Sequence, residues 1–206
     1  MNNQLQDTRW SENVILVDAD YVDKVTFSLI VNFERMLGRR IPQADLARWI
    51  DCVALDGGLR EGAHETLVVL AHQKDKARLE NFAPSNYADE IDGKAFKDHL
   101  GEFIISAIPI EAIADSEDYL TEALRLVTAQ KEVKRVMVIP NAEDAYIYNK
   151  VREALKHVDD EDKRITVFAM APQPGGNFRQ EILGYSLMAA LGITSDEINR
   201  KSVNQK

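Results

Sequence analysis

The apolar segment at residues 13–18, with the sequence NVILVD, is the feature that most restricts the fold of this chain. Its central residues are Val, Ile and Leu, and no polar residue alternates with them. A strand of this composition must be covered on both faces, which is typical of parallel sheets in α/β proteins. The segment therefore predicts a strand inside a parallel sheet.

Further segments of the same kind recur along the chain, and apolar stripes at helical spacing lie between them. Strands are predicted at residues 13–18, 65–72, 102–110, 135–140 and 164–172. Helices are predicted after residue 18 up to Gly38, between Pro42 and Gly57, near 93–99, and at 116–130, 145–158 and 178–191. Strands that alternate with helices indicate right-handed crossovers with helices on both faces of the sheet. We therefore predict an α/β fold, a Rossmann-like three-layer α/β/α sandwich with a mainly parallel sheet of about five strands.

The length and composition suit one soluble domain. The chain has 206 residues, of which 45% are hydrophobic and 29% charged, and one domain typically holds about 100 to 200 residues. We expect a single domain at residues 12–192 with flexible tails at 1–11 and 195–206. One cysteine, no apolar run long enough for a membrane span, and no signal-peptide pattern at the start indicate a cytoplasmic protein.

The formal net charge of −9 argues against a general polyanion binder, because phosphate affinity depends on Lys and Arg. RNA could still be bound through a local basic patch, and ordinary solvated surface charge is the alternative. The candidate patches are Arg39 with Arg40, the group Lys74, Lys76 and Arg78, and the group Lys131, Lys134 and Arg135.

Two carboxylates follow the first predicted strand. Asp18 and Asp20 stand two residues apart, so on an extended segment their side chains point to the same side. Like charges this close favour a cation between them, and oxygen ligands suit Mg²⁺ or Mn²⁺. The alternative is structural, with Asp18 accepting bonds from loop amides and Asp20 capping the helix that starts at Tyr21.

Acidic residues also follow the third and fourth predicted strands. They are Asp115, Glu117 and Asp118 at one helix start, and Glu143 and Asp144 at another. The helix dipole favours acids at these positions without any catalytic role. However, the carboxyl ends of parallel strands share one edge of the sheet, where ligands bind in such folds, so these groups are predicted to form one acidic pocket.

The order of elements and the placement of these acids resemble the PIN-like nuclease superfamily, particularly its NYN branch, over residues 13–190. "VDADY" resembles the first Asp-x-Asp-Asn motif through Asp18 and Asp20, with Tyr21 in place of Asn. "SEDYL" resembles the helix-borne acidic motif through Asp118. "IPNAEDAY" lies where the family has Ser-Gly-Asp-x-Asp-Phe, with Asp144 at the second Asp and Ala142 at the first.

This resemblance implies a Mg²⁺- or Mn²⁺-dependent ribonuclease. Asp18, Asp118 and Asp144 would hold one or two metal ions, and Asp20 would be an outer ligand or orient the others. Because one carboxylate of the family motif is replaced, an active nuclease and an inactive member both remain open.

Three other readings remain open. "DADYV" also fits the haloacid dehalogenase pattern with Asp18 as nucleophile, although no suitable later strand end supplies the remaining motifs. The loop "PQPGGNFRQE" could bind an anion if Asn177 capped the last helix and Arg179 assisted. A non-enzymatic protein that binds partners or forms a homodimer would use Tyr146, Tyr148, Leu187 and Met188, which could equally fill the core.

Overall fold

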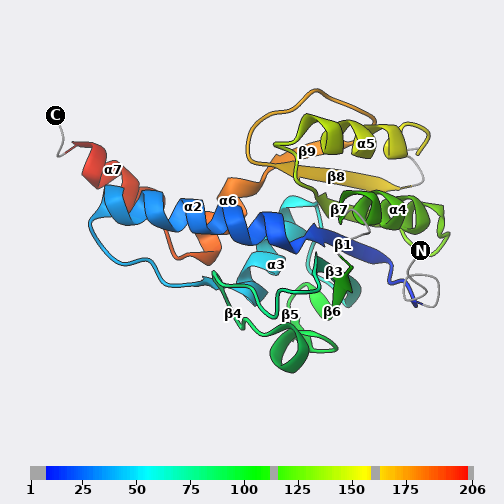
Figure 1. The fold of residues 1–206 in the computed structure, drawn as a ribbon, viewed down its shortest axis with the longest axis horizontal. Coiled ribbons are helices and arrows are strands. Elements are labelled where there is room, and N and C mark those ends of the chain that lie inside the picture. Colours follow the sequence, from blue (N-terminus) through cyan, green and yellow to red (C-terminus); the bar gives the residue numbers. More distant parts are fainter. Residues whose placement is uncertain (1–7, 112–115, 159–162, 204–206) are drawn as a thin grey trace.

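The computed structural model describes residues 8–111, 116–158 and 163–203. A seven-stranded sheet in the order β5-β6-β3-β1-β7-β8-β9 forms its centre (Figure 1). The strands are β1 (Asn13–Asp18), β3 (His64–Gln73), β5 (Ala95–Asp98), β6 (Gly101–Ile110), β7 (Arg135–Ile139), β8 (Arg164–Ala169) and β9 (Arg179–Ile182). All neighbours pair in parallel except β5, which is antiparallel to β6. The predicted α/β class and mainly parallel sheet are confirmed.

The strand order places β1 at the point where the chain changes direction across the sheet. From β1 the chain builds outward through β3 to β6, and it then returns to add β7 on the other side of β1. Ile15 therefore pairs with Val68 on one side and with Met137 on the other. In such sheets the carboxyl ends of the strands on either side of this switch leave a crevice for ligands.

Helices cover both faces of the sheet. One core contains Ile15 and Val17 together with side chains of α2 (Ala19–Leu37), α3 (Leu46–Asp56) and α6 (Leu183–Ala190). The other contains Val14 and Leu16 with side chains of α4 (Ser116–Ala129) and α5 (Ala145–Leu155). Successive residues of β1 thus enter opposite cores, which explains why its sequence shows no polar alternation.

Three details of the sequence prediction were wrong. The sheet has seven strands rather than about five, because two short edge strands join the five predicted ones. Residues 95–98 form β5 instead of a helix, where Phe96 stacks on Phe103 of β6 at 4.8 Å between ring centroids. The predicted helix at 178–191 begins only at Leu183, since residues 179–182 pair with β8 as β9.

The excursion between β3 and β6 contains little regular structure. The two-residue strand β4 (Phe82–Ala83) pairs with β2 (Ala44–Asp45), which leads into α3. A short π-helical turn, η1 (Tyr87–Ile91), buries Tyr87 and Ile91. These elements close the core beside the carboxyl end of β3.

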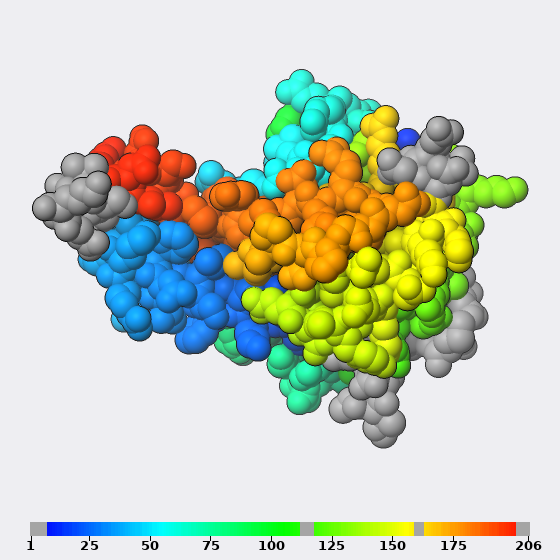
Figure 2. Space-filling view, turned by 90° about the horizontal axis from the view of Figure 1, so that it is seen from above, coloured from blue at the N-terminus to red at the C-terminus, as the bar shows by residue number. Residues whose placement is uncertain are grey.

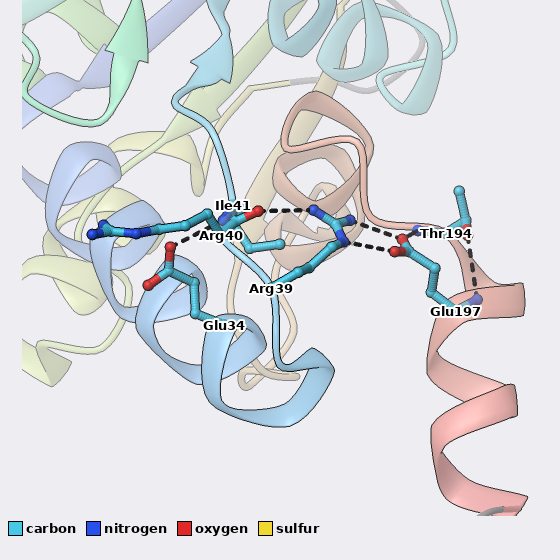
Figure 3. A network of polar contacts seen from close by, with 6 residues as sticks. All are labelled: Glu34, Arg39, Arg40, Ile41, Thr194 and Glu197. Atoms are coloured by element: carbon cyan, nitrogen blue, oxygen red, sulfur yellow. Dashed lines mark hydrogen bonds and ion pairs between the residues drawn. The ribbon is translucent and has the colours of Figure 1, made fainter.

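The C-terminal helix α7 (Ser195–Val203) lies against the end of α2, and the two form a projection from the body of the molecule (Figure 2). Arg39 joins them by donating from Nε and Nη2 to the two carboxylate oxygens of Glu197, at 2.8 and 3.0 Å (Figure 3). Residues 195–203, expected to be part of a tail, are therefore helical, while 1–7 and 204–206 lie outside the described residues. None of the described helices is long and apolar enough to span a membrane.

Candidate functional site at the carboxyl edge

Asp18 ends β1 and caps α2. Its Oδ1 accepts a hydrogen bond of 2.9 Å from the backbone N–H of Tyr21, so the helix cap is Asp18 rather than Asp20. Burial raises the pKa of Asp18 to about 6, and the neighbouring Asp20 adds to this, while the Tyr21 amide and Lys76 act in the opposite direction. A carboxylate placed in this way gains from any cation that approaches it.

Asp20 connects the start of α2 to the end of β3. Its Oδ2 accepts a 2.8 Å hydrogen bond from the Gln73 amide, and its Oδ1 lies 2.9 Å from Nζ of Lys76. The Asp20 side chain is only 16% exposed, whereas that of Lys76 is 47% exposed. The Gln73 amide thus fixes Asp20. Its present cationic partner, Lys76, has a half-exposed side chain that can move.

Tyr21 and Glu143 lie beside this pair. The Tyr21 hydroxyl is buried and has no hydrogen-bond partner among the described residues. Burial raises the pKa of this hydroxyl, and the charges of Glu143 and Asp18 raise it further. Glu143 follows β7, which pairs in parallel with β1, so it lies at the same edge of the sheet as Asp18. We call Asp18, Asp20 and Glu143 the acidic edge.

A stacked ring pair stands next to the acidic edge. The rings of His72 and Tyr87 are parallel within 10° and their centroids lie 3.7 Å apart. Both side chains are buried. Burial, and then the charges of Asp20, Asp23 and Asp18, raise the pKa of Tyr87. The stack packs the η1 turn against the carboxyl end of β3.

The other two predicted metal ligands are engaged locally. Asp144 caps α5, and its Oδ1 accepts hydrogen bonds from the amides of Tyr146 and Ile147 at 2.8 and 3.3 Å. Asp118, at the start of α4, pairs with Lys150 of α5, and 59% of its side chain is exposed. Asp115 and the side chain of Glu117 lie outside the described residues. Asp118 and Asp144 thus have structural partners of their own.

The described residues contain one group of three ligand side chains whose ligand atoms all lie within 4.8 Å of one another. It consists of Asp51, Asp98 and His99, and the set Asp18, Asp118 and Asp144 is not such a group. Lys150 and the α5 amides hold Asp118 and Asp144 in their own pairings. For both to reach an ion at Asp18, these side chains would have to leave their present partners.

The Asp51 group lies away from the carboxyl edge, between α3 and the turn that precedes β6. Burial raises the pKa of Asp51 to about 7, and a hydrogen bond with Asp98 and the charge of Asp98 add to the effect. The raised pKa favours the protonated form of Asp51 beside the Asp98 carboxyl group. Asp51 and Asp98 are far apart in the sequence and the sheet brings them together, so no local motif indicated this group.

The loop at residues 172–181 does not have the predicted capping geometry. Asn177 donates from Nδ2 to the carbonyl of Val158, and α6 begins after Ile182 without a side-chain cap. The carbonyls of Pro174 and Gly175 accept hydrogen bonds from Tyr148 and Arg152 at 2.7 and 3.1 Å. The prediction of an anion site with Asn177 as the cap was wrong, because β9 separates this loop from the helix.

Comparison with known proteins identifies a family whose function is unknown. A family model described as a family of unknown function, DUF6621, matches residues 7–198. The chain belongs to the DUF6621 family. No curated protein and no solved structure matches it. For this DUF6621 protein the resemblance to PIN-like nucleases therefore remains a prediction.

Proposed function

We propose that the acidic edge binds Mg²⁺ or Mn²⁺ and hydrolyses phosphodiester bonds in RNA. The observation that carries the proposal is topological: Asp18 and Asp20 stand at and just after the end of β1, Glu143 follows β7, and these two neighbouring parallel strands end at the same edge, beside the strand-order switch. Helices on both faces and acids at this edge agree with the three-layer, PIN-like arrangement that forms part of the proposal. Asp118 and Asp144, the other acids that match the family motifs, are held by Lys150 and by the amides of α5.

The acidic edge offers the carboxylate oxygens that a hard divalent cation prefers. Among the described residues its ligand atoms do not all lie within 4.8 Å of one another, so the side chains would have to turn toward the ion. Asp18 uses one oxygen as a helix cap, and Asp20 would exchange the half-exposed Lys76 for the ion. Glu143 is exposed and can turn toward the same place. Three carboxylates supply the oxygen ligands that Mg²⁺ prefers, and bound Mg²⁺ retains several waters.

The side chains nearby suit the handling of a phosphodiester. A bound divalent ion would neutralise phosphate charge and lower the pKa of a coordinated water. Lys76, once released from Asp20, has an ammonium group free to bind a phosphate oxygen. The unpartnered Tyr21 hydroxyl is a donor in a buried position, where a hydrogen bond to a charged oxygen contributes most.

Mn²⁺ binding and cleavage of single-stranded RNA test the proposal. We expect the wild-type chain to cleave RNA with Mn²⁺, and Asp18→Asn to lose both cleavage and at least about tenfold in Mn²⁺ affinity. Asp20→Asn is the second variant, because it preserves the hydrogen bond from Gln73. Thermal melting establishes that each variant is folded.

Asp51→Asn is the matched control, since it makes the same substitution in the group whose ligand atoms lie within 4.8 Å of one another. It should keep wild-type Mn²⁺ affinity and cleavage. Unchanged Mn²⁺ affinity in Asp18→Asn, or loss of affinity only in Asp51→Asn, would refute the assignment of the ion to the acidic edge. Absence of cleavage by the wild-type chain would refute the nuclease.

A second candidate is a binding protein without catalytic activity, including a homodimer. It is favoured by large apolar side chains that stay exposed, with Phe27 at 56%, Tyr146 at 62% and Tyr185 at 69%. Tyr148 and Leu187, which the sequence also suggested for a dimer, are buried in the two cores, and Met188 packs against one of them. Light scattering at high concentration tests this alternative, and a monomer there argues against the dimer.

A further inference from the structure

The amino edge of the sheet, opposite the acidic edge, contains a cavity of about 430 Å³. It lies between the turn after α3 and the first residues of β1, β3, β7 and β8. Four cationic side chains line it, Arg60, Lys134, Arg135 and Arg164, against one carboxylate, Glu12. We call it the basic cavity. In Figure 2 the cyan atoms of the segment after α3 stand beside the gold atoms at the start of β8.

The sequence places these cations by a repeated pattern. The neighbouring strands β7 and β8 both begin with an Arg that follows a Lys, in "KRVMVI" and "KRITVF". Because the two strands are parallel and in register, Arg135 stands directly opposite Arg164. Two adjacent parallel strands that start with the same basic residue collect positive charge at one edge.

These cations have no acidic partners. Among residues 8–111, 116–158 and 163–203, no carboxylate lies within 4.0 Å of the charged nitrogens of Arg60, Lys134, Arg135 or Arg164. Arg60 donates to the carbonyls of Leu55 and Leu59, and Arg135 donates from Nη1 to the carbonyl of Gly57 at 2.6 Å. The buried Nε of Arg135 has no hydrogen-bond partner in the described part of the chain. Arg135 therefore has a donor that no described protein atom satisfies.

The backbone brings a further guanidinium to the same place. Gly58 has φ of +87°, a conformation that glycine adopts without strain. The Nη1 atoms of Arg135 and Arg179 lie 2.9 and 3.6 Å from the position that a Cβ on Gly58 would occupy. Burial, and then the charges of Arg164, Arg60 and Arg179, lower the pKa of Arg135, while Glu12 opposes them. The positive charges thus repel one another where no anion stands between them.

We propose that the basic cavity binds a small phosphate-bearing anion, with Arg60, Arg135 and Arg164 as its ligands. Guanidinium groups bind phosphate oxygens in pairs, and such contacts are among the stronger hydrogen bonds in proteins. The volume exceeds that of one phosphate group and falls within the range of about 300 to 1,000 Å³ for small-molecule sites. A concave site on a chain with net charge −9 favours a compact anion over a long polyanion.

Calorimetry with tripolyphosphate, without divalent ions and at about 0.15 M salt, tests the proposal. We expect binding to the wild-type chain and at least about tenfold weaker binding to the double variant Arg60→Gln/Arg164→Gln. Both side chains are exposed, so the variant should fold. Orthophosphate and a nucleoside triphosphate are titrated in parallel, and tighter binding of the nucleotide than of tripolyphosphate identifies a nucleoside contact in the cavity.

The control variant Arg78→Gln/Arg125→Gln removes two charges from glutamate pairs outside the cavity and should bind tripolyphosphate as the wild type does. Thermal melting without ligand gives a second measurement. Removing mutually repelling charges should leave the melting temperature of Arg60→Gln/Arg164→Gln unchanged or raise it, whereas a purely structural role predicts that it falls.

Three results would overturn the proposal. They are no binding of tripolyphosphate or nucleotide to the wild-type chain, equal losses in the double variant and its control, and binding of an RNA oligonucleotide without binding of either small anion. Asp18→Asn should bind tripolyphosphate normally, because the basic cavity lies at the opposite edge from Asp18. Failure of the nuclease proposal therefore leaves this result unaffected.

Discussion

The two edges of the sheet carry opposite charges, and they differ in how these charges are compensated. At the acidic edge, backbone amides bind Asp18 and Asp20, and Lys76 neutralises Asp20. At the basic cavity, no described carboxylate pairs with the four lining cations, and Arg135 keeps a buried donor without a partner. Charges that are paired within the protein contribute to folding. Charges that the protein leaves unpaired are better evidence for a ligand.

Gly101→Ala should have the largest effect on stability, and it should disturb the amino edge of the sheet but not the acidic edge. Gly101 has φ of +118°, and a Cβ there would lie 2.2 Å from the carbonyl oxygen of His64 at the amino end of β3. We expect the free energy of unfolding to fall by about 3 kcal/mol or more. Urea denaturation measures this loss.

If the variant still folds, calorimetry should give weaker tripolyphosphate binding with little change in Mn²⁺ binding. A stable variant with both affinities intact would contradict the view that Gly101 positions the amino edge. Gly93→Ala is the matched control, because Gly93 also has positive φ but a Cβ there meets no atom within 4 Å.

Lys76→Gln should sharpen the comparison by removing the internal cation from the acidic edge. We expect a loss of about 1 kcal/mol in the free energy of unfolding near neutral pH, since the ion pair is partly exposed. Mn²⁺ should bind more tightly, because the ion no longer competes with the ammonium group. Tighter Mn²⁺ binding together with loss of RNA cleavage in Lys76→Gln agrees with a role for Lys76 at the phosphate. Weaker Mn²⁺ binding would argue against competition between Lys76 and the metal ion.

Asp51 should make stability depend on pH. Its pKa is raised from 3.8 to about 7, so the folded state holds a proton that the unfolded chain has already released. The contribution of Asp51 to stability is therefore greatest below pH 4, decreases between about pH 4 and 7, and is constant above. Asp51 is partly exposed, which limits the effect.

Chemical denaturation at a series of pH values measures this dependence in the wild-type chain and in Asp51→Asn. The variant cannot release the proton, so its stability should change less over the same range. An identical pH profile for both chains would exclude Asp51 as the titrating group.

Glu197→Gln should have the smallest effect, because it breaks a single partly exposed pair between the loop after α2 and α7, away from both edges. We expect a slightly lower melting temperature at low salt and less difference at high salt, where such pairs are screened. Mn²⁺ and tripolyphosphate affinities should stay at wild-type values. A change in either affinity would mean that the projection of α2 and α7 influences an edge.

The sequence predicted the elements that are set by strong local patterns. The uninterrupted apolar runs identified the five central strands, and Gly38 marked the end of α2 through its positive φ of 67°. It did not identify β5 and β9, because four-residue edge strands carry little pattern of their own and depend on a neighbouring strand for pairing.

As with the fold, the sequence predicted only part of each candidate site. Asp18 and Asp20 were found because they follow a clear strand, but the pairing of Asp20 with Lys76 depends on a loop whose path no local rule specifies. Lys134 and Arg135 were noted as one basic patch. Their meeting with Arg60 and Arg164 required the strand order, which places β7 beside β8 and the turn after α3 beside both.

Strand β1 is bonded on both sides and buried on both faces, and it joins the two edges through only six residues. Its amide hydrogens should therefore exchange with solvent only when the whole domain opens. Since Glu12 precedes this strand and Asp18 ends it, any event that frees β1 would disrupt the acidic edge and the basic cavity together.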